Sequence, residues 1–175
     1  MTQMRTIESV PFATDLAAAL ATPGTDAMRV AEDFFGLADL FKENTRLARA
    51  LTDPARSLAD KQSLAQEAFA SHVTTATMAV VNLVVADHWR HPADVADTLE
   101  VLGILGVLNA AGAEGALEQV REELFQVRYF LAHQREVRVR LSDKSKGDAH
   151  ERGDVASKLF AAHVSIWTMR LVRRA

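Results

Sequence analysis

The histidines near residue 88 are the first group whose residue types could do chemistry. His88 and His91 lie three residues apart, with two aspartates nearby. Two histidines on one helix face bind a metal most readily at a spacing of four. Here the spacing is three and the segment runs into Pro92, which favours an ordinary polar turn. The sequence therefore predicts no metal site at this place.

Other catalytic groups are not predicted either. The chain has no cysteine, which removes thiol nucleophiles, thiolate zinc sites and disulfides. The glycines from Gly103 to Gly115 do not follow a strand and no Lys-Ser/Thr follows them, so they do not form a phosphate loop. The acidic pairs Glu32-Asp33 and Glu122-Glu123 are sequence neighbours, which we expect on the solvated flank of helices. We therefore predict no catalytic residue, no cofactor and no bound nucleotide.

Length and charge limit the remaining classes of function. A chain of 175 residues forms one large domain or two small ones. The net charge of −3, with both signs interspersed, gives no general attraction to nucleic acid or to anionic lipid. No apolar run reaches the roughly 20 residues that cross a bilayer, and Pro11 and Asp15 make the N-terminal stretch a poor signal peptide. We expect neither nucleic-acid binding nor direct membrane insertion.

Hydrophobic periodicity predicts an all-α protein. The expected helices of the first part cover about 9–21, 26–43, 45–51, 58–71, 75–87 and a stretch from residue 92 onward. Pro11 suits the first turn of the first helix, and Asn44, Ser57 and Thr74 are expected to cap later helices. The apolar residues that recur at helical spacing along one face of these helices predict the following core residues: Phe34, Leu37, Leu51, Leu64, Phe69 and Met78.

The helical pattern recurs in the second part of the chain. The matching residues are Val30/Val120, Glu32/Glu122, Phe35/Phe125, Leu51/Leu141 and Asp53/Asp143 at one offset, and Ala65/Ala156, Phe69/Phe160, His72/His163, Thr77/Thr168 and Met78/Met169 at an offset one residue longer. Because one change of offset keeps the whole set in register, we interpret it as a duplicated helical unit. His72 and His163 then share a local role at a helix C-terminus, where a basic group is favourable.

This repeat predicts the domain organisation. We expect a six-helix bundle at 9–112 and a partial second copy at 113–175, which has no counterpart of the sixth helix. A bundle that lacks one helix leaves an apolar groove open, which either a partner or a further part of a longer chain would fill. The polar stretch 142–153 is expected to be an exposed loop.

Several short sequence segments, occurring in the same order, are similar to segments of one protein family. They are Pro11-Phe-Ala-Thr-Asp-Leu16, Asn44 to Pro54 and Ala86 to Val95. The chain resembles the delta subunit of the F-type ATP synthase, which in mitochondria is called the oligomycin-sensitivity-conferring protein. Its second part, with Glu122-Glu-Leu-Phe125 and Leu141-Ser-Asp143, resembles the longer actinobacterial members.

The resemblance implies a non-catalytic stator subunit at the cytoplasmic face of the cell membrane. Such a subunit links the top of the α/β catalytic hexamer to the peripheral stalk during proton-driven ATP synthesis. The first bundle would bind the N-terminal helix of an α subunit, between the first helix and the helix that begins at Pro92. The residues expected at that interface are Phe12, Ala13, Leu16, Ala17, Leu20, Val95, Leu99 and Leu102. The family's C-terminal portion, which binds the stalk b subunit, has no counterpart here, and Lys144 replaces the proline that follows Asp53.

Two other interpretations stay open at this point. An unrelated all-α adaptor could bind a partner helix in the same kind of apolar groove. A helical metal-dependent or hydrolytic enzyme would have to use His88, His91 and the acids around them. The sequence does not decide which copy of the repeat would bind an α subunit.

Overall fold

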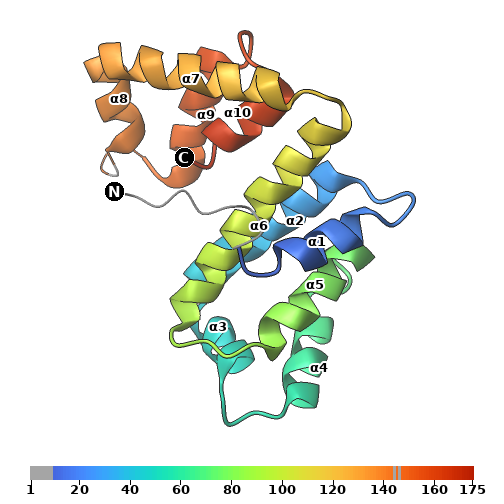
Figure 1. Cartoon of the computed structure of the whole chain (residues 1–175). Coiled ribbons are helices and arrows are strands. Elements are labelled where there is room, and N and C mark those ends of the chain that lie inside the picture. Colours follow the sequence, from blue (N-terminus) through green and yellow to red (C-terminus); the bar gives the residue numbers. More distant parts are fainter. Residues whose placement is uncertain (1–9, 144, 146) are drawn as a thin grey trace. The chain divides into compact units, whose positions relative to one another are not determined.

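The computed structural model describes residues 10–143, 145 and 147–175, and this part of the chain contains helices and no strand (Figure 1). The all-α prediction is therefore confirmed. The helices are α1 (Ala13–Leu20), α2 (Ala27–Glu43), α3 (Thr45–Thr52), α4 (Leu58–Phe69), α5 (Thr75–Ala86), α6 (Pro92–Ala113), α7 (Leu117–His133), α8 (Arg135–Ser142), α9 (Ala149–Phe160) and α10 (Ile166–Val172). Residue 9, where the first helix was expected to begin, lies outside the described residues.

The chain divides into two compact units, Met1–Asn109 and Ala110–Ala175. The first unit holds α1 to α5 and most of α6, and the second unit holds α7 to α10. The sequence placed the boundary at 112/113, close to this division. Each unit packs its helices around a separate hydrophobic cluster.

The predicted caps begin their helices as expected. The Asn44 side chain accepts a hydrogen bond from the Leu47 amide at 3.1 Å, and the Ser57 hydroxyl accepts one from the Asp60 amide at 3.1 Å. The Thr74 hydroxyl caps α5 in the same way. Each of these bonds satisfies an amide that has no partner within the helix, which fixes where the helix starts.

Two local predictions are wrong. Pro11 does not lie in the first turn, because α1 begins only at Ala13 and Phe12 occupies the left-handed region at φ 62°. The stretch 142–153 is not all loop, because α9 already begins at Ala149. Its start is fixed by a capping box, in which the Asp148 carboxylate accepts from the Glu151 amide and the Glu151 carboxylate accepts from the Asp148 amide. Polarity alone did not reveal this pair of contacts.

The core of the first unit contains most of the residues predicted for it. Phe34, Leu37, Leu51, Phe69 and Met78 are buried in one cluster, and Leu64 is half-buried at its edge. Leu64 differs because it lies on a flank of α4, whereas Ala65 and Phe69 point inward. The Phe41 and Phe69 rings pack with their centroids 6.1 Å apart.

Helix α6 packs closely against α2. A Cβ atom added to Gly106 would lie 2.9 Å from the Ala31 Cβ, and one added to Gly103 would lie 2.5 Å from the Phe35 ring. The two glycines therefore permit a backbone approach that larger residues would block. By length and average composition α6 could cross a membrane, although no uninterrupted apolar run suggested it. The burial of its inner stripe in the first core accounts for this composition.

Helices α7 to α9 of the second unit have the same lengths as the helices that they match in the first unit by the two sequence offsets. Helices α2 and α7 have 17 residues each, α3 and α8 have 8 each, and α4 and α9 have 12 each. The chain also leaves α4 and α9 in the same way, since the amides of His72 and His163 both donate to the last phenylalanine carbonyl at 2.8 Å. Duplication stays an interpretation of the sequence, and these bounds support it.

A buried carboxylate joins distant helices in each unit. In the first unit, Asp33 Oδ2 accepts from the Thr74 amide at 2.7 Å and from the Thr77 hydroxyl at 2.8 Å. In the second unit, Glu123 Oε2 accepts from the Ser165 amide at 2.9 Å and from its hydroxyl at 2.6 Å. The expectation that both acids lie on solvated flanks is wrong, because each is less than a tenth exposed.

The hydrogen bonds change the ionisation of Glu123. Burial by itself raises the pKa of this carboxyl, but the hydrogen bonds from Ser165, Thr168 and Gln119 outweigh it and hold the pKa at about 2, below the ordinary 4.5. The charged form is therefore the form that stabilises the folded state. This contribution is present above about pH 4.5 and is lost as the pH falls from there toward 2.

We predict that Phe69→Ala lowers the free energy of unfolding of the first unit by about 3–5 kcal/mol, because it removes a buried ring and leaves a cavity. Urea unfolding of the variant and the wild type measures the difference. Phe125→Ala is the matched control, because Phe125 is 60% exposed. A loss under about 1 kcal/mol for Phe69→Ala would contradict the packing described here.

We predict that Glu123→Gln destabilises the second unit by about 1–3 kcal/mol at pH 7, because a hydrogen-bonded charge is removed. The difference from the wild type should shrink as the pH is lowered from about 5 toward 2. Unfolding followed by Trp167 fluorescence, in a Trp89→Phe background, measures it. The exposed neighbour Glu122 provides the control Glu122→Gln, and an equal effect of the two substitutions would show that the buried contacts contribute nothing.

Candidate functional site

The residues predicted to bind a partner helix fall into two groups. Leu16, Val95, Leu99 and Leu102 are at most 2% exposed and belong to the same core cluster. Phe12 and Leu20 are half-buried against that cluster. The structure therefore brings these six side chains together, but in the interior of the first unit, where they pack against one another.

The accessible part of this candidate site is the outer face of α1. Ala17 is exposed and Ala13 is half-buried, and Thr14, Asp15 and Ala18 are exposed beside them. Small side chains on this face would let another backbone approach α1 closely. A partner helix would thus contact Ala17 and its neighbours, while Leu16 holds α1 on the core from the other side.

Phe12 is held by contacts that the sequence did not indicate. Its ring packs against Trp89, with the centroids 6.3 Å apart, and the Trp89 indole donates to the Val84 carbonyl at 2.7 Å. A phenylalanine with positive φ costs free energy that surrounding contacts must offset. The turn between α5 and α6 therefore positions the start of α1.

The two histidines near residue 88 lie in the turn between α5 and α6. His88 and His91 are both exposed. Among the described residues, no group of three or more His, Asp or Glu side chains is arranged to hold a metal ion.

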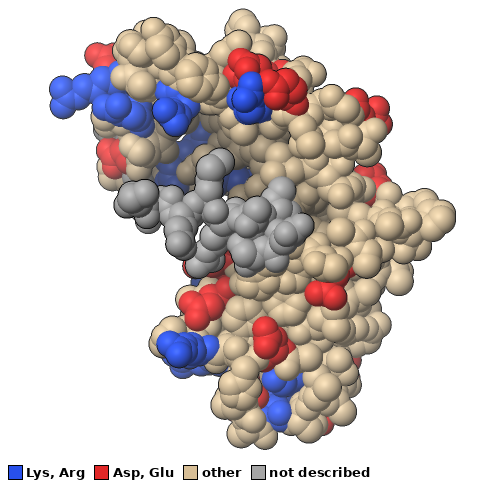
Figure 2. Space-filling view, viewed as in Figure 1, with Lys and Arg blue, Asp and Glu red and all other residues tan. Residues whose placement is uncertain are grey.

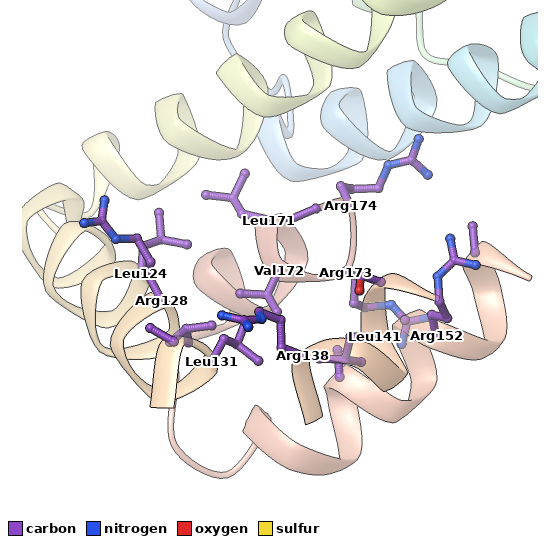
Figure 3. Close-up of a pocket in the computed structure, with 17 residues that line it drawn as sticks. Leu124, Arg128, Leu131, Arg138, Leu141, Arg152, Leu171, Val172, Arg173 and Arg174 are labelled. Carbon is purple, nitrogen blue, oxygen red and sulfur yellow. The ribbon is translucent and has the colours of Figure 1, made fainter. Parts of the chain in front are cut away.

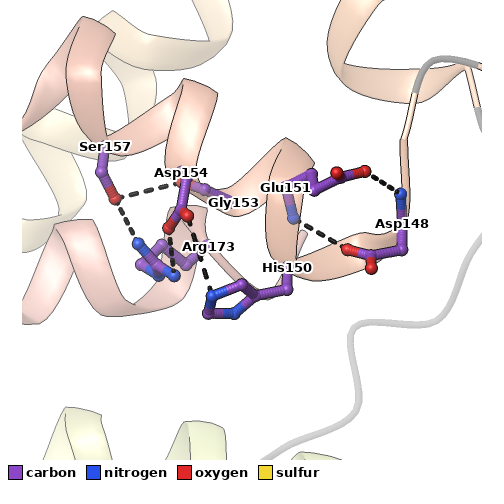
Figure 4. A network of polar contacts seen from close by, with 7 residues as sticks. All are labelled: Asp148, His150, Glu151, Gly153, Asp154, Ser157 and Arg173. Atoms are coloured by element: carbon purple, nitrogen blue, oxygen red, sulfur yellow. Dashed lines mark hydrogen bonds and ion pairs between the residues drawn. The ribbon is translucent and has the colours of Figure 1, made fainter.

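A polar network on α9 has the residue types of a hydrolase but not the geometry (Figure 4). His150 Nε2 lies 3.7 Å from Asp154, but Ser157 donates to the Gly153 carbonyl and accepts from Arg173 at 2.6 Å. A nucleophilic serine needs a base that accepts its proton. Here Arg173 instead bridges Ser157 and Asp154, which fastens the end of α10 to α9.

The second unit contains a groove that residue-by-residue prediction did not describe. It lies among α7, α8, α9 and α10 and has a volume of about 720 Å³. Figure 3 shows leucines on its walls, including Leu124, Leu131 and Leu141, together with several arginines. The repeat predicted an open apolar groove in this half of the chain. The arginine rim could have been found only by comparing the two copies position by position.

Comparison with known proteins identifies relatives that agree with the resemblance found in the sequence. No protein-family model matches the chain. Curated relatives named ATP synthase subunit delta do match: 35% identity over 156 residues in Beutenbergia cavernae, 31% over 156 residues in Kineococcus radiotolerans and 33% over 161 residues in Bifidobacterium longum subsp. infantis. These matches cover 89%, 89% and 91% of the chain.

The chain is similar to ATP synthase delta subunits along about nine-tenths of its own length. The resemblance found in the sequence is thereby confirmed. The chain spans little more than half the length of these relatives, between 56% and 58% in the three comparisons. The similarity to delta subunits therefore extends over both helical units, and the tasks of a whole delta subunit come to this chain only as proposals.

We predict that Leu16→Ala lowers the free energy of unfolding by about 2–5 kcal/mol, because Leu16 is a core residue. Ala17→Glu on the exposed face should change it by less than about 0.5 kcal/mol. Urea unfolding of both variants tests which face of α1 is free to meet a partner. Equal destabilisation by the two substitutions would mean that α1 is buried on both faces.

Proposed function

We propose that this chain is a non-catalytic stator component of an F-type ATP synthase. In that role it would belong to the link between the α/β catalytic hexamer and the peripheral stalk, at the cytoplasmic side of the membrane. The observation that carries the proposal is the match to ATP synthase delta subunits along about nine-tenths of the chain. Any contact with the stalk b subunit would need the portion of the relatives that this chain does not span.

The packing of the first unit suits such a role. A stator transmits torque, so its body must resist deformation, and close-packed interiors have low compressibility. Helix α6 approaches α2 at two glycines, and the Asp33 carboxylate ties α2 to the start of α5. The unit can therefore hold a partner on its surface without rearranging its core.

We further propose that the first unit binds the N-terminal helix of an α subunit on the exposed face of α1. The resemblance motivates the partner, and the exposure of Ala17 and Ala18, beside the half-buried Ala13, motivates the surface. Val95, Leu99 and Leu102 then support this site from inside the core rather than touching the partner. An amphipathic helix laid against small residues is a recurrent mode of recognition.

We predict that a labelled peptide with the sequence of an α-subunit N-terminal helix binds the full chain saturably. Ala17→Glu and Ala18→Glu should each weaken binding by about tenfold, because a carboxylate would be buried without a partner at the contact. Fluorescence anisotropy titration measures the affinity. Ala59→Glu, an exposed alanine on α4, is the matched control and should bind like the wild type.

Saturable binding that neither α1 substitution changes would remove α1 from the interface. No binding by the folded wild-type chain would favour the alternative interpretation, an all-α adaptor with a different partner. The presence of other ATP-synthase subunit genes beside this one would independently support the stator assignment.

A further inference from the structure

The groove of the second unit combines an apolar floor with a positively charged rim. Its floor includes Leu131, Leu141 and Val172, which are half-buried. Five arginines line it (Arg128, Arg138, Arg152, Arg173 and Arg174), and the described lining contains no Asp or Glu side chain. Figure 2 shows Lys and Arg side chains gathered on the α8 side of this unit. The groove is therefore positively charged, although the chain as a whole has a net charge of −3.

The corresponding positions in the first unit show what normally covers this floor. By the repeat offsets, Leu131, Leu141 and Val172 match Phe41, Leu51 and Val81, which are at most 4% exposed. Those three residues belong to a core that α1 and α6 complete with Leu16, Val95, Leu99 and Leu102. The same kind of floor is thus covered by helices in one unit and open in the other.

The rim of the groove differs from the first unit in charge. Arg128 and Arg138 match Ala38 and Ala48, which are 0% and 2% exposed in the first core. Within the described part of the chain, the side chains of Arg128 and Arg138 are exposed and make no hydrogen bond or ion pair. Their charges are therefore available to a ligand, and a helix like α6 that replaced solvent there would have to accommodate them.

Arg152 and Arg173 have structural partners within the second unit. Arg152 donates to the Gly147 carbonyl at 2.7 Å, and Arg173 bridges Asp154 and Ser157. These contacts fix one side of the groove. Arg128 on α7 and Arg138 on α8 are therefore the residues that would select the charge of a ligand.

We propose that this groove binds an amphipathic helix of a partner protein, with an apolar stripe on the leucine floor and acidic residues facing Arg128 and Arg138. A helix fits because the matching surface of the first unit is covered by helices, and because the described backbone offers no strand edge. An acidic flank fits because opposite charges favour encounter and fix the orientation of the bound helix. The site lies wholly in the second unit and does not depend on the proposed stator function.

Two synthetic peptides of about 20 residues test the proposal on the full chain. Both carry the same leucine stripe at helical spacing, and their flanks carry either glutamate or lysine. Anisotropy titration should show saturable binding of the glutamate peptide and at least about tenfold weaker binding of the lysine peptide. Added salt should reduce this difference, because exposed charges are screened.

Charge-reversal variants locate the site. Arg128→Glu and Arg138→Glu should each weaken the binding of the glutamate peptide by about tenfold and strengthen the binding of the lysine peptide. Lys158→Glu makes the same charge change at an exposed residue of α9 that does not line the groove, and it should bind like the wild type. Far-ultraviolet circular dichroism confirms that each variant is folded.

Three results would overturn the proposal. The first is equal affinity for the two peptides, and the second is an affinity that neither Arg128→Glu nor Arg138→Glu changes. The third is the absence of saturable binding by the glutamate peptide. Ala17→Glu separates this site from the one proposed on α1, because it should leave the binding of the glutamate peptide unchanged.

Discussion

The two buried carboxylates are the contacts on which the arrangement of both units depends. Asp33 and Glu123 each lie in the middle of a long helix and accept hydrogen bonds from the first residues of a helix about forty positions later in the chain. A buried charge is tolerated only when such bonds replace its hydration. Each contact therefore fixes where the later helix begins, and the packing of the remaining helices follows from it.

The two units share the same arrangement of helices but differ on the surface formed by α2 and α3 in the first unit and by α7 and α8 in the second. In the first unit that face carries alanines and is covered by α1 and α6, whereas in the second unit it carries arginines and is open. A change of two small residues to arginines alters the chemistry of a surface without disturbing the carboxylate contact. The same arrangement of helices can in this way build part of a buried core in one unit and an open ligand-binding surface in the other.

The sequence predicted most of the fold because helix starts are set locally. Asn44, Ser57 and Thr74 were recognisable caps. Contacts between distant residues were not predictable from periodicity. The burial of Asp33 depends on Thr77, 44 positions away, and the position of Phe12 depends on Trp89. For the same reason periodicity could not separate Leu16, which faces the core, from Ala17, which faces solvent.

Each unit is formed by one continuous stretch of the chain, and this arrangement has a consequence for biosynthesis. The last helix of the first unit, α6, supplies Val95, Leu99 and Leu102 to its core. The first core can therefore close as soon as these residues have left the ribosome, while the second unit is still being translated. The order of synthesis thus keeps the leucines of the second unit away from an unfinished first core.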